Sequence, residues 1–275
     1  MHDHPYTIIT GASQGFGKSL ALECAERNWP LILVSLPGDD LHQLAEYIRM
    51  NYNIPVLYFG YDLSRKEDCL AFYEAILEKK LSVNILINNA GVGGTHLFEE
   101  RDPGFYQQQI ALNVLAPTIL SHLFLPLLKK HAISHILNVS SMAGLFSLPG
   151  KQVYGGTKSY LLSFSKSLRR ELKMKNVSVS VICPGGMNTT LSLIVQNRRL
   201  TGMSRWSIMD PEEVAAIAIN GMLEGKEVII PGGWNRFFIF LDKIIPPGIK
   251  DYLLNQQVMK KARLATLYLP GRLPV

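Results

Sequence analysis

Short apolar runs alternate with amphipathic stretches along the chain up to about residue 231. The runs are almost uninterrupted, which is typical of parallel strands that helices cover on both faces. They predict seven strands, at Tyr6–Thr10, Leu31–Ser35, Pro55–Gly60, Asn84–Asn88, His135–Ser141, Val177–Cys183 and Glu227–Pro231. Strands that alternate with helices build repeated βαβ units. We therefore expect an α/β fold, a Rossmann-like doubly wound parallel sheet of about seven strands.

The helices between these runs have recognisable start signals. Ser64 with Glu67 forms the pattern of a capping box, and Asp210 precedes a first-turn proline with Glu213 three residues after the aspartate. Internal repeats, low-complexity segments and linkers are lacking in the sequence. We therefore expect one dinucleotide-binding and catalytic domain over residues 1–232, followed by a helical, basic and apolar extension over residues 233–275.

Composition narrows the class of protein. With 275 residues, 47% hydrophobic and 18% charged, the chain can bury a large core, which excludes disorder and coiled coil. The three cysteines include no C-x-x-C pair, and the histidines show no ligand spacing beyond H-x-H near the start, so we expect neither disulfide nor metal. No signal peptide is readable, and every apolar run meets a charged residue, a histidine or a Pro/Gly pair before ~20 residues. These features predict a cytoplasmic protein.

The net charge of +6 is concentrated near the end of the sequence. Between Lys226 and Val275 there are eight basic and three acidic residues, so the rest of the chain is almost neutral. A basic tail can indicate a nucleic-acid partner, but no helix-turn-helix, zinc-finger or aromatic RNA-binding pattern accompanies it. We therefore expect no nucleic-acid partner.

A glycine-rich turn follows the first predicted strand. It reads Thr10-Gly-Ala-Ser-Gln-Gly-Phe-Gly17 and leads into a helix predicted over Lys18–Asn28. Glycines permit a tight turn and the close approach of a pyrophosphate, while a helix N-terminus offers free amides and a positive dipole end. The turn therefore predicts dinucleotide binding.

Tyr154 and Lys158 are four residues apart on a predicted helix, which places phenol and ammonium on one face. A nearby cation favours the phenolate, so we expect Lys158 to lower the pKa of Tyr154 from its usual ~10. Ser141 ends the fifth predicted strand, where active-site groups of open α/β sheets gather. Together these side chains predict a site for proton transfer.

Four sets of motif residues, in order along residues 5–232, resemble those of the short-chain dehydrogenase/reductase family, in its classical branch. They are the TGxxxGxG turn at Thr10–Gly17, the segment Asn88-Asn-Ala-Gly91, the tetrad Asn113, Ser141, Tyr154 and Lys158, and Pro184-Gly185 with Thr189. The resemblance implies a nicotinamide-dependent oxidoreductase with that tetrad as its catalytic residues. It implies cofactor binding by Thr10, Gly11, Ser13, Gly15, Phe16, Gly17, Ser35, Asp62, Asn89, Ala90, Gly91, Tyr154, Lys158, Pro184, Gly185 and Thr189.

The resemblance also implies individual roles. A substrate carbonyl would be hydrogen-bonded by Ser141 and Tyr154, receive hydride from the nicotinamide, and take the proton of Tyr154. Lys158 would lower the tyrosine pKa and hold the nicotinamide ribose. Asn113 would help to hold a water that links Lys158 to solvent, and Asp62 would contact the adenine unless it only caps the next helix.

The resemblance does not decide whether the cofactor is NAD(H) or NADP(H). Members that select NAD place an acid at the end of the second strand, where this chain has Ser35. Members that select NADP follow with arginine or carry a basic residue in the glycine turn, where this chain has Leu36, Pro37 and Gln14. Lys18, or a residue near the turn Gly38-Asp39-Asp40, is a candidate substitute partner for the 2′-phosphate. The missing acid favours NADP(H), with NAD(H) as the alternative.

In this family the segment between Pro184 and Asp210 covers the substrate, and its apolar residues here predict a hydrophobic carbonyl substrate of 3-oxoacyl or steroid-like type. These residues are Met187, Leu191, Ile194, Met203 and Trp206, joined by Met142, Leu145, Phe146 and Leu148 after the catalytic serine. Two alternatives stay open. One is a carrier-protein-linked 3-oxoacyl reductase, in which an acidic carrier would be attracted by Lys129, Lys130, Lys173 and Lys175. The other is a non-catalytic cofactor-binding sensor, although all four tetrad positions are kept.

Two surfaces predict larger partners. The segment after Asn113 is apolar nearly all round, and in this family the corresponding helix and the one carrying the tyrosine form a homodimer interface. The extension combines Trp234, Phe237, Phe238 and Phe240 with the basic residues Arg236, Lys243, Lys250, Lys260, Lys261 and Arg263. An interfacial helix needs both kinds of residue, so the extension predicts peripheral membrane contact, with packing on the body as the alternative.

Overall fold

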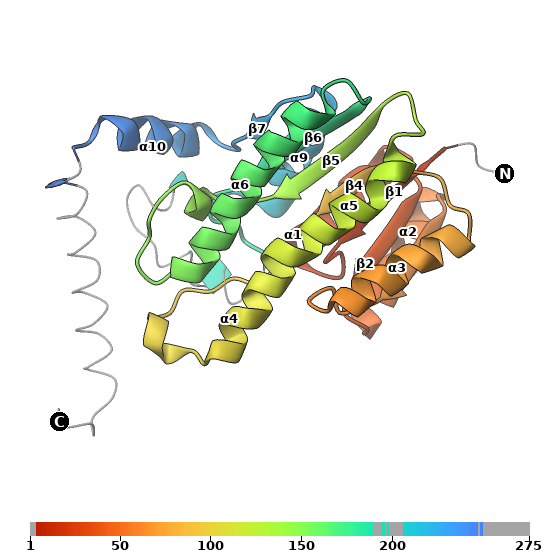
Figure 1. Ribbon diagram of the computed structural model, residues 1–275, viewed down its shortest axis with the longest axis horizontal. Helices are drawn as coiled ribbons and strands as arrows, with labels where there is room; N and C mark the ends of the chain where they lie inside the picture. Colours follow the sequence, from red (N-terminus) through yellow and green to blue (C-terminus); the bar gives the residue numbers. More distant parts are fainter. Residues whose placement is uncertain (1–3, 190–193, 196, 198–205, 247, 250–275) are drawn as a thin grey trace.

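The protein is a single parallel sheet with helices on both faces (Figure 1). The structure is a computed structural model that describes residues 4–189, 194–195, 197, 206–246 and 248–249. The seven strands are β1 (Tyr6–Thr10), β2 (Leu31–Ser35), β3 (Val56–Gly60), β4 (Val83–Asn88), β5 (Ser134–Val139), β6 (Val177–Ile182) and β7 (Val228–Ile229). Their order is β3-β2-β1-β4-β5-β6-β7, and every pair is parallel. The predicted doubly wound α/β fold is confirmed.

Two apolar layers hold the helices onto the sheet. One face packs against α1 (Gly15–Glu26), α2 (Asp39–Tyr52) and α9 (Pro211–Leu223). The other packs against α3 (Lys66–Glu78), α5 (Ala116–Leu128) and α6 (Gln152–Leu172). Alternate residues of one strand serve the two layers: in β1, Ile9 belongs to the first and Ile8 to the second. Burial on both faces explains why the strands read as continuous apolar runs.

A continuous helix lies across the second face, built from α4 (Pro103–Ile110), a π-helical turn (Ala111–Leu115) and α5. It runs 26 residues, and by length and composition alone it is apolar enough to cross a membrane. The sequence had predicted that a charged residue, a histidine or a Pro/Gly pair would interrupt every apolar run before such a length. Leu120, Phe124 and Leu128 are fully or almost fully buried in the layer beneath it. The apolar composition of α5 therefore serves packing on the sheet.

Some predicted boundaries shift, each for a local reason. Helix α1 begins at Gly15, inside the glycine turn, and it ends before Asn28, which has a left-handed φ of 61°. Strand β5 ends at Val139, two residues before the serine predicted as its last residue. The capping box at Ser64 is wrong, because Ser64 Oγ donates to Asp62 Oδ1 at 2.7 Å and Arg65 is the N-cap of α3. Asp210 is the N-cap of α9, as predicted, but its side chain caps no amide there.

Beyond β7, the chain forms α10 (Gly233–Ile244), which leaves the edge of the sheet and extends away from the body (Figure 1). The first part of the extension is thus helical. Three residues predicted to shape the substrate pocket or the tail, Leu191, Met203 and Lys250, lie outside the described residues, as do Lys260, Lys261, Arg263 and Arg272.

Candidate active site

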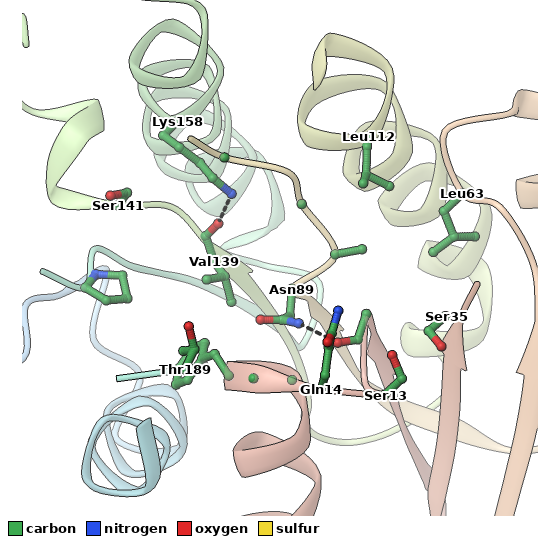
Figure 2. Close-up of a pocket in the computed structure, with 18 of the residues that line it drawn as sticks. Ser13, Gln14, Ser35, Leu63, Asn89, Leu112, Val139, Ser141, Lys158 and Thr189 are labelled. Atoms are coloured by element: carbon green, nitrogen blue, oxygen red, sulfur yellow. Dashed lines mark hydrogen bonds between the residues drawn. The ribbon is translucent and has the colours of Figure 1, made fainter. Parts of the chain in front are cut away.

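A cleft of about 490 Å³ opens at the carboxyl ends of the strands, where ligands bind in open α/β sheets. Figure 2 shows one end of it near Ser141 and Lys158 and the other near Ser13, Gln14 and Ser35. Most of the residues that the sequence motifs indicate line this cleft: Gly11, Ser13, Gly15, Phe16, Gly17, Ser35, Asp62, Asn89, Ala90, Gly91, Ser141, Tyr154, Lys158, Pro184, Gly185 and Thr189. Thr10 and Asn113 do not line it and lie buried behind its wall.

The floor of the cleft is the turn between β1 and α1. Gly11 and Gly15 have left-handed φ values of 63° and 57°, which side chains disfavour. A Cβ on Gly17 would lie 2.0 Å from the main-chain oxygen of Gly11, so only glycine fits there. Gln14 is the N-cap of α1 and makes no side-chain cap hydrogen bond. The turn therefore leaves room for a pyrophosphate at the amides of α1, and these residues fit a dinucleotide.

Thr10 and Asn89 brace this turn against β4. Thr10 Oγ1 accepts hydrogen bonds from the main-chain nitrogens of Asn89 and Ala90, both at 2.9 Å. Asn89 Nδ2 in turn donates to the main-chain oxygens of Thr10 at 2.9 Å and Gly11 at 3.1 Å, and the second of these atoms lies next to Gly17. Thr10 thus shapes the cleft from behind its wall.

Ser141 and Tyr154 meet at the other end of the cleft. Ser141 Oγ accepts a hydrogen bond of 3.1 Å from the main-chain nitrogen of Ala143, which leaves its hydroxyl proton free to be donated. Burial raises the pKa of Tyr154, and a hydrogen bond from Ser141 opposes that rise. The pair therefore holds a phenol that is protonated at neutral pH.

Lys158 is almost fully buried, with 4% of its surface exposed. Its Nζ donates to the main-chain oxygen of Val139 at 2.8 Å and lies 5.8 Å from the centroid of the Tyr154 ring. Burial lowers the pKa of Lys158 to about 8. In this structure the pKa of Tyr154 is raised rather than lowered as expected, because burial of the phenol dominates, and Lys158 is not among the groups that shift it.

Asn113 lies in the π-helical turn, a distortion that often marks functional sites. Its Oδ1 accepts from the main-chain nitrogen of Val92 at 2.9 Å, and its Nδ2 donates to Val92 O at 3.0 Å and to Thr157 Oγ1 at 3.1 Å. A Cβ on Gly91 would lie 3.0 Å from Asn113 Oδ1 and 3.3 Å from Lys158 Nζ. Asn113 therefore fixes the loop after β4 close to the ammonium.

The end of the cleft away from Tyr154 is lined by Ser35, Leu36 and Asp62. Ser35 is buried and its hydroxyl donates to Leu36 O at 3.1 Å. Asp62 Oδ1 accepts from the main-chain nitrogen and the hydroxyl of Ser64. Among the described lining residues, Lys158 is the only cation, and Lys18 is exposed outside the cleft.

Several residues that line the cleft belong to none of the sequence motifs: Tyr61, Leu63, Gly93, Gln108, Leu112, Val139 and Ser140. Tyr61 and Leu63 flank Asp62, and Leu112 precedes Asn113, so adjacency to motif residues was the available signal. Of the apolar residues predicted for the substrate pocket, Met187 lines the cleft, whereas Ile194 lines a separate hollow. Leu145, Phe146 and Leu148 line another hollow beside the start of α6, and Trp206 is half exposed. The prediction that these four residues and Ile194 line the substrate pocket is therefore wrong, because none of them lines the cleft.

Comparison with known proteins agrees with this geometry. A family model described as short chain dehydrogenase matches residues 6–198. The chain is 30% identical over 253 residues to 11-beta-hydroxysteroid dehydrogenase-like 2 of Arabidopsis thaliana, covering 90% of this chain and 80% of that protein. A short-chain dehydrogenase from Sphingobium yanoikuyae in complex with NADPH has a TM-score of 0.75 at 24% identity, covering 98% of both chains. One from Burkholderia phymatum in complex with NAD has a TM-score of 0.76 at 23% identity, covering 87% of this chain and 92% of that one.

Proposed function

The chain belongs to the short-chain dehydrogenase/reductase family of nicotinamide-dependent oxidoreductases, and we propose that it reduces a hydrophobic ketone with Tyr154 as the general acid. One observation carries this proposal: Ser141, Tyr154 and Lys158 meet at one end of a cleft whose floor is the glycine turn. The same arrangement would run the oxidation of the corresponding alcohol, with Tyr154 as the base.

In the reductive direction, each side chain of the site has a separate role. When bound, the nicotinamide supplies hydride to the carbonyl carbon. Ser141 would turn its hydroxyl proton from Tyr154 to the carbonyl oxygen, and Tyr154 would transfer its phenolic proton to that oxygen as charge develops on it. Lys158 supplies a buried positive charge below pH about 8 and would hold the nicotinamide ribose. Asn113 keeps the loop after β4 in place beside Lys158, and a water that it helps to hold would return the proton.

The substrate class follows from the cleft wall. Leu112, Val139 and Met187 are apolar, which favours a 3-oxoacyl or steroid-like ketone over a sugar. The Arabidopsis thaliana relative is named for hydroxysteroids, which supports the steroid-like reading. The carrier-linked alternative loses support from the position of its lysines. Lys129, Lys130, Lys173 and Lys175 lie between the ends of α5 and α6 and the amino ends of β5 and β6. The cleft opens at the carboxyl ends of the strands, so these lysines lie at the opposite edge of the sheet.

We propose NADP(H) as the cofactor, with NAD(H) as the alternative. Ser35 stands where an acid would reject the 2′-phosphate, which supports NADP(H). In favour of NAD(H), the described cleft residues around Ser35 include no cation, and α2 begins with the acids Asp39 and Asp40. The structures of the Sphingobium yanoikuyae and Burkholderia phymatum proteins hold different nicotinamides, so the comparison does not choose between them.

We further propose a homodimer in the cytoplasm, with peripheral membrane contact through the extension. Helices α5 and α6 lie side by side on one face (Figure 1), and Thr118 Oγ1 lies 3.0 Å from Tyr160 Oη between them. Leu115, in the π-helical turn that leads into α5, is 52% exposed, as expected of a residue that a second copy covers. On α10, Trp234, Phe237 and Phe240 are 44% to 60% exposed.

Activity against a panel of ketones tests the proposed function. The purified protein is given aliphatic ketones, 3-oxoacyl thioesters and steroid ketones, each with NADPH and with NADH, and cofactor oxidation is followed. Turnover of at least one hydrophobic ketone supports the reductase. Tight binding of a nicotinamide without turnover in either direction on any ketone or alcohol would favour the sensor instead.

A further inference from the structure

A buried amide connects α10 to the wall of the cleft. Asn235, in the first turn of α10, is only 1% exposed, whereas its neighbours Trp234 and Arg236 are exposed. Its Nδ2 donates to Pro231 O at 2.8 Å and to Ser207 O at 3.4 Å. Among the described residues, its Oδ1 has no hydrogen-bond partner. A buried polar group that is incompletely paired is costly, so its presence here requires a reason.

Asn235 is pressed against Gly185, which lines the cleft. A Cβ on Gly185 would lie 2.8 Å from both Nδ2 and Oδ1 of Asn235, and also 2.8 Å from Ser207 O. Gly232 has a left-handed φ of 82° and turns the chain into α10. A Cβ on Gly232 would lie only 3.0 Å from the Met209 sulfur. Three separate parts of the chain therefore meet at this one amide.

Two of these parts, around Gly185 and Ser207, lead into the neck of the segment that the family resemblance predicts to cover the substrate. We define this neck as Met187 and Asn188 on its outgoing side and Met209 and Asp210 on its return. Met187 and Met209 pair as a parallel bridge. Met209 N donates to Gly186 O at 3.1 Å, and Asn188 Nδ2 donates to Asp210 Oδ1 at 3.0 Å. Since Met187 lines the cleft, the position of the neck sets the substrate side of the cleft.

A second contact ties the same two elements. The rings of Trp206, just before the neck, and Trp234, in the first turn of α10, have centroids 4.7 Å apart. Both tryptophans are about half exposed, so this tilted ring pair lies at the surface, whereas Asn235 is buried. An aromatic contact and a buried amide thus hold α10 to the return side of the neck.

We propose that Asn235 is a positioning residue of the active site: through Ser207 and Gly185 it fixes the neck against the cleft, so that α10 belongs to the catalytic unit. It touches no reacting atom and acts through Met187 and the wall at Gly185. The kinetic part of its test rests on the proposed ketone reduction, whereas the spectroscopic part does not.

The variant Asn235→Leu tests this role, because leucine has nearly the shape of asparagine but cannot donate to Ser207 O or Pro231 O. It is made in a Trp29→Phe background, which leaves Trp206 and Trp234 as the only tryptophans. We expect the near-UV circular dichroism of the Trp206–Trp234 pair to weaken. We also expect KM for the ketone to rise roughly tenfold or more, while kcat and the cofactor Kd change less than about threefold. The control is Phe240→Leu, on the exposed face of α10, for which neither quantity should change.

The outcomes separate the possible failures. An unchanged KM with an unchanged tryptophan signal, or a lowered melting temperature with an unchanged KM, overturns the positioning role. If no ketone is turned over, the proposed function fails, and the tryptophan signal alone still decides the contact. If Asn235→Leu does not fold, Asn235→Ser takes its place: a helical serine bonds the carbonyl four residues back but is too short to reach Ser207 O, and the same changes are expected.

Discussion

Lys158 Nζ donates its hydrogen bond to the main-chain oxygen of Val139, at the last residue of β5, and holds its charge 5.8 Å from the centre of the Tyr154 ring. The end of β5 thereby positions the ammonium, and Ser141 is the residue that hydrogen-bonds the Tyr154 phenol. Because the lysine is buried, its charged form is disfavoured and its pKa is lowered to about 8. The protonation state of Lys158 therefore changes with pH just above neutrality.

A pH profile of the reduction tests this consequence. The pKa of Lys158 is lowered to about 8, so the residue is charged below that pH and neutral above it. We expect kcat/KM for the reduced cofactor, which reports on the free enzyme, to be flat below pH about 8 and to fall above it. In Lys158→Arg, whose guanidinium stays charged, any residual activity should lack this limb. A flat profile through pH about 10 would contradict the assignment.

The same shift affects stability with a defined sign. The folded protein releases the Lys158 proton at about 8, whereas the unfolded chain holds it to about 10.5. Between these values the unfolded state binds more protons, so the contribution of Lys158 to the free energy of unfolding increases as pH rises. Denaturant unfolding of the wild type and of Lys158→Met at pH about 8 and 10 checks this: the difference between the two proteins should change in favour of the wild type.

Tyr154→Phe removes the transferable proton and leaves the cofactor turn intact. We expect the rate of ketone reduction to fall at least ~100-fold, since general acid catalysis contributes about that much or more, with cofactor Kd nearly unchanged. Cofactor oxidation gives the rate, and quenching of protein fluorescence gives the Kd. Substantial ketone reduction by this variant would rule out Tyr154 as the acid.

The positions of the strands along the chain, the glycine turn and the covering of both sheet faces by helices were predictable, because each depends on residues close together in sequence. The apolar runs identified all seven strands to within two residues at each end, although only two residues pair in β7. The motif residues also converged on one cleft. The contact of Lys158 with Val139 was not predictable, because tyrosine and lysine on one helix face show only that the two are near each other. Nothing in the sequence marks the π-helical turn at Asn113 or the burial of Asn235, since both depend on packing between distant segments.

Cofactor preference is tested at Ser35. Its buried hydroxyl donates to Leu36 O, and it lines the end of the cleft away from Tyr154. If NADP(H) is preferred, Ser35→Asp should shift the ratio of cofactor affinities toward NAD(H) by about tenfold or more, because a carboxylate repels the 2′-phosphate and accepts from free ribose hydroxyls. Titrations with NADPH and NADH measure both proteins. Equal Kd values for the two cofactors in the unmodified protein would show that Ser35 gives no preference.

The homodimer is tested at Leu115. This residue is 52% exposed in the π-helical turn, and Ile110, one turn before it, is 44% exposed. A charge buried in an apolar interface is strongly unfavourable, so Leu115→Glu should turn a dimer into a monomer. Sedimentation velocity at micromolar concentration measures the change, and Met174→Glu, at another exposed apolar position, should leave the dimer intact. A monomeric wild type would contradict the proposal.

Membrane contact is tested on the outer face of α10. Asn235 holds the first turn inward, while Phe237, Phe240 and Ile244 are 44%, 60% and 59% exposed. From Gly233 onward the sequence has seven basic and two acidic residues, so it carries most of the net positive charge of the chain. Exposed aromatic and aliphatic side chains beside basic residues favour the interface of an anionic bilayer.

We therefore expect the full-length protein to co-sediment with vesicles of anionic phospholipid at low salt, and to be released as salt screens the attraction. The double variant Phe240→Glu with Ile244→Glu should lose this binding and keep its ketone reductase activity, because neither side chain reaches the neck of the substrate-covering segment. Met174→Glu, which removes an even more exposed apolar side chain just after α6, should bind as the wild type does. If the wild type stays in the supernatant at low salt, the outer face of α10 does not bind lipid, and its aromatic residues serve packing alone.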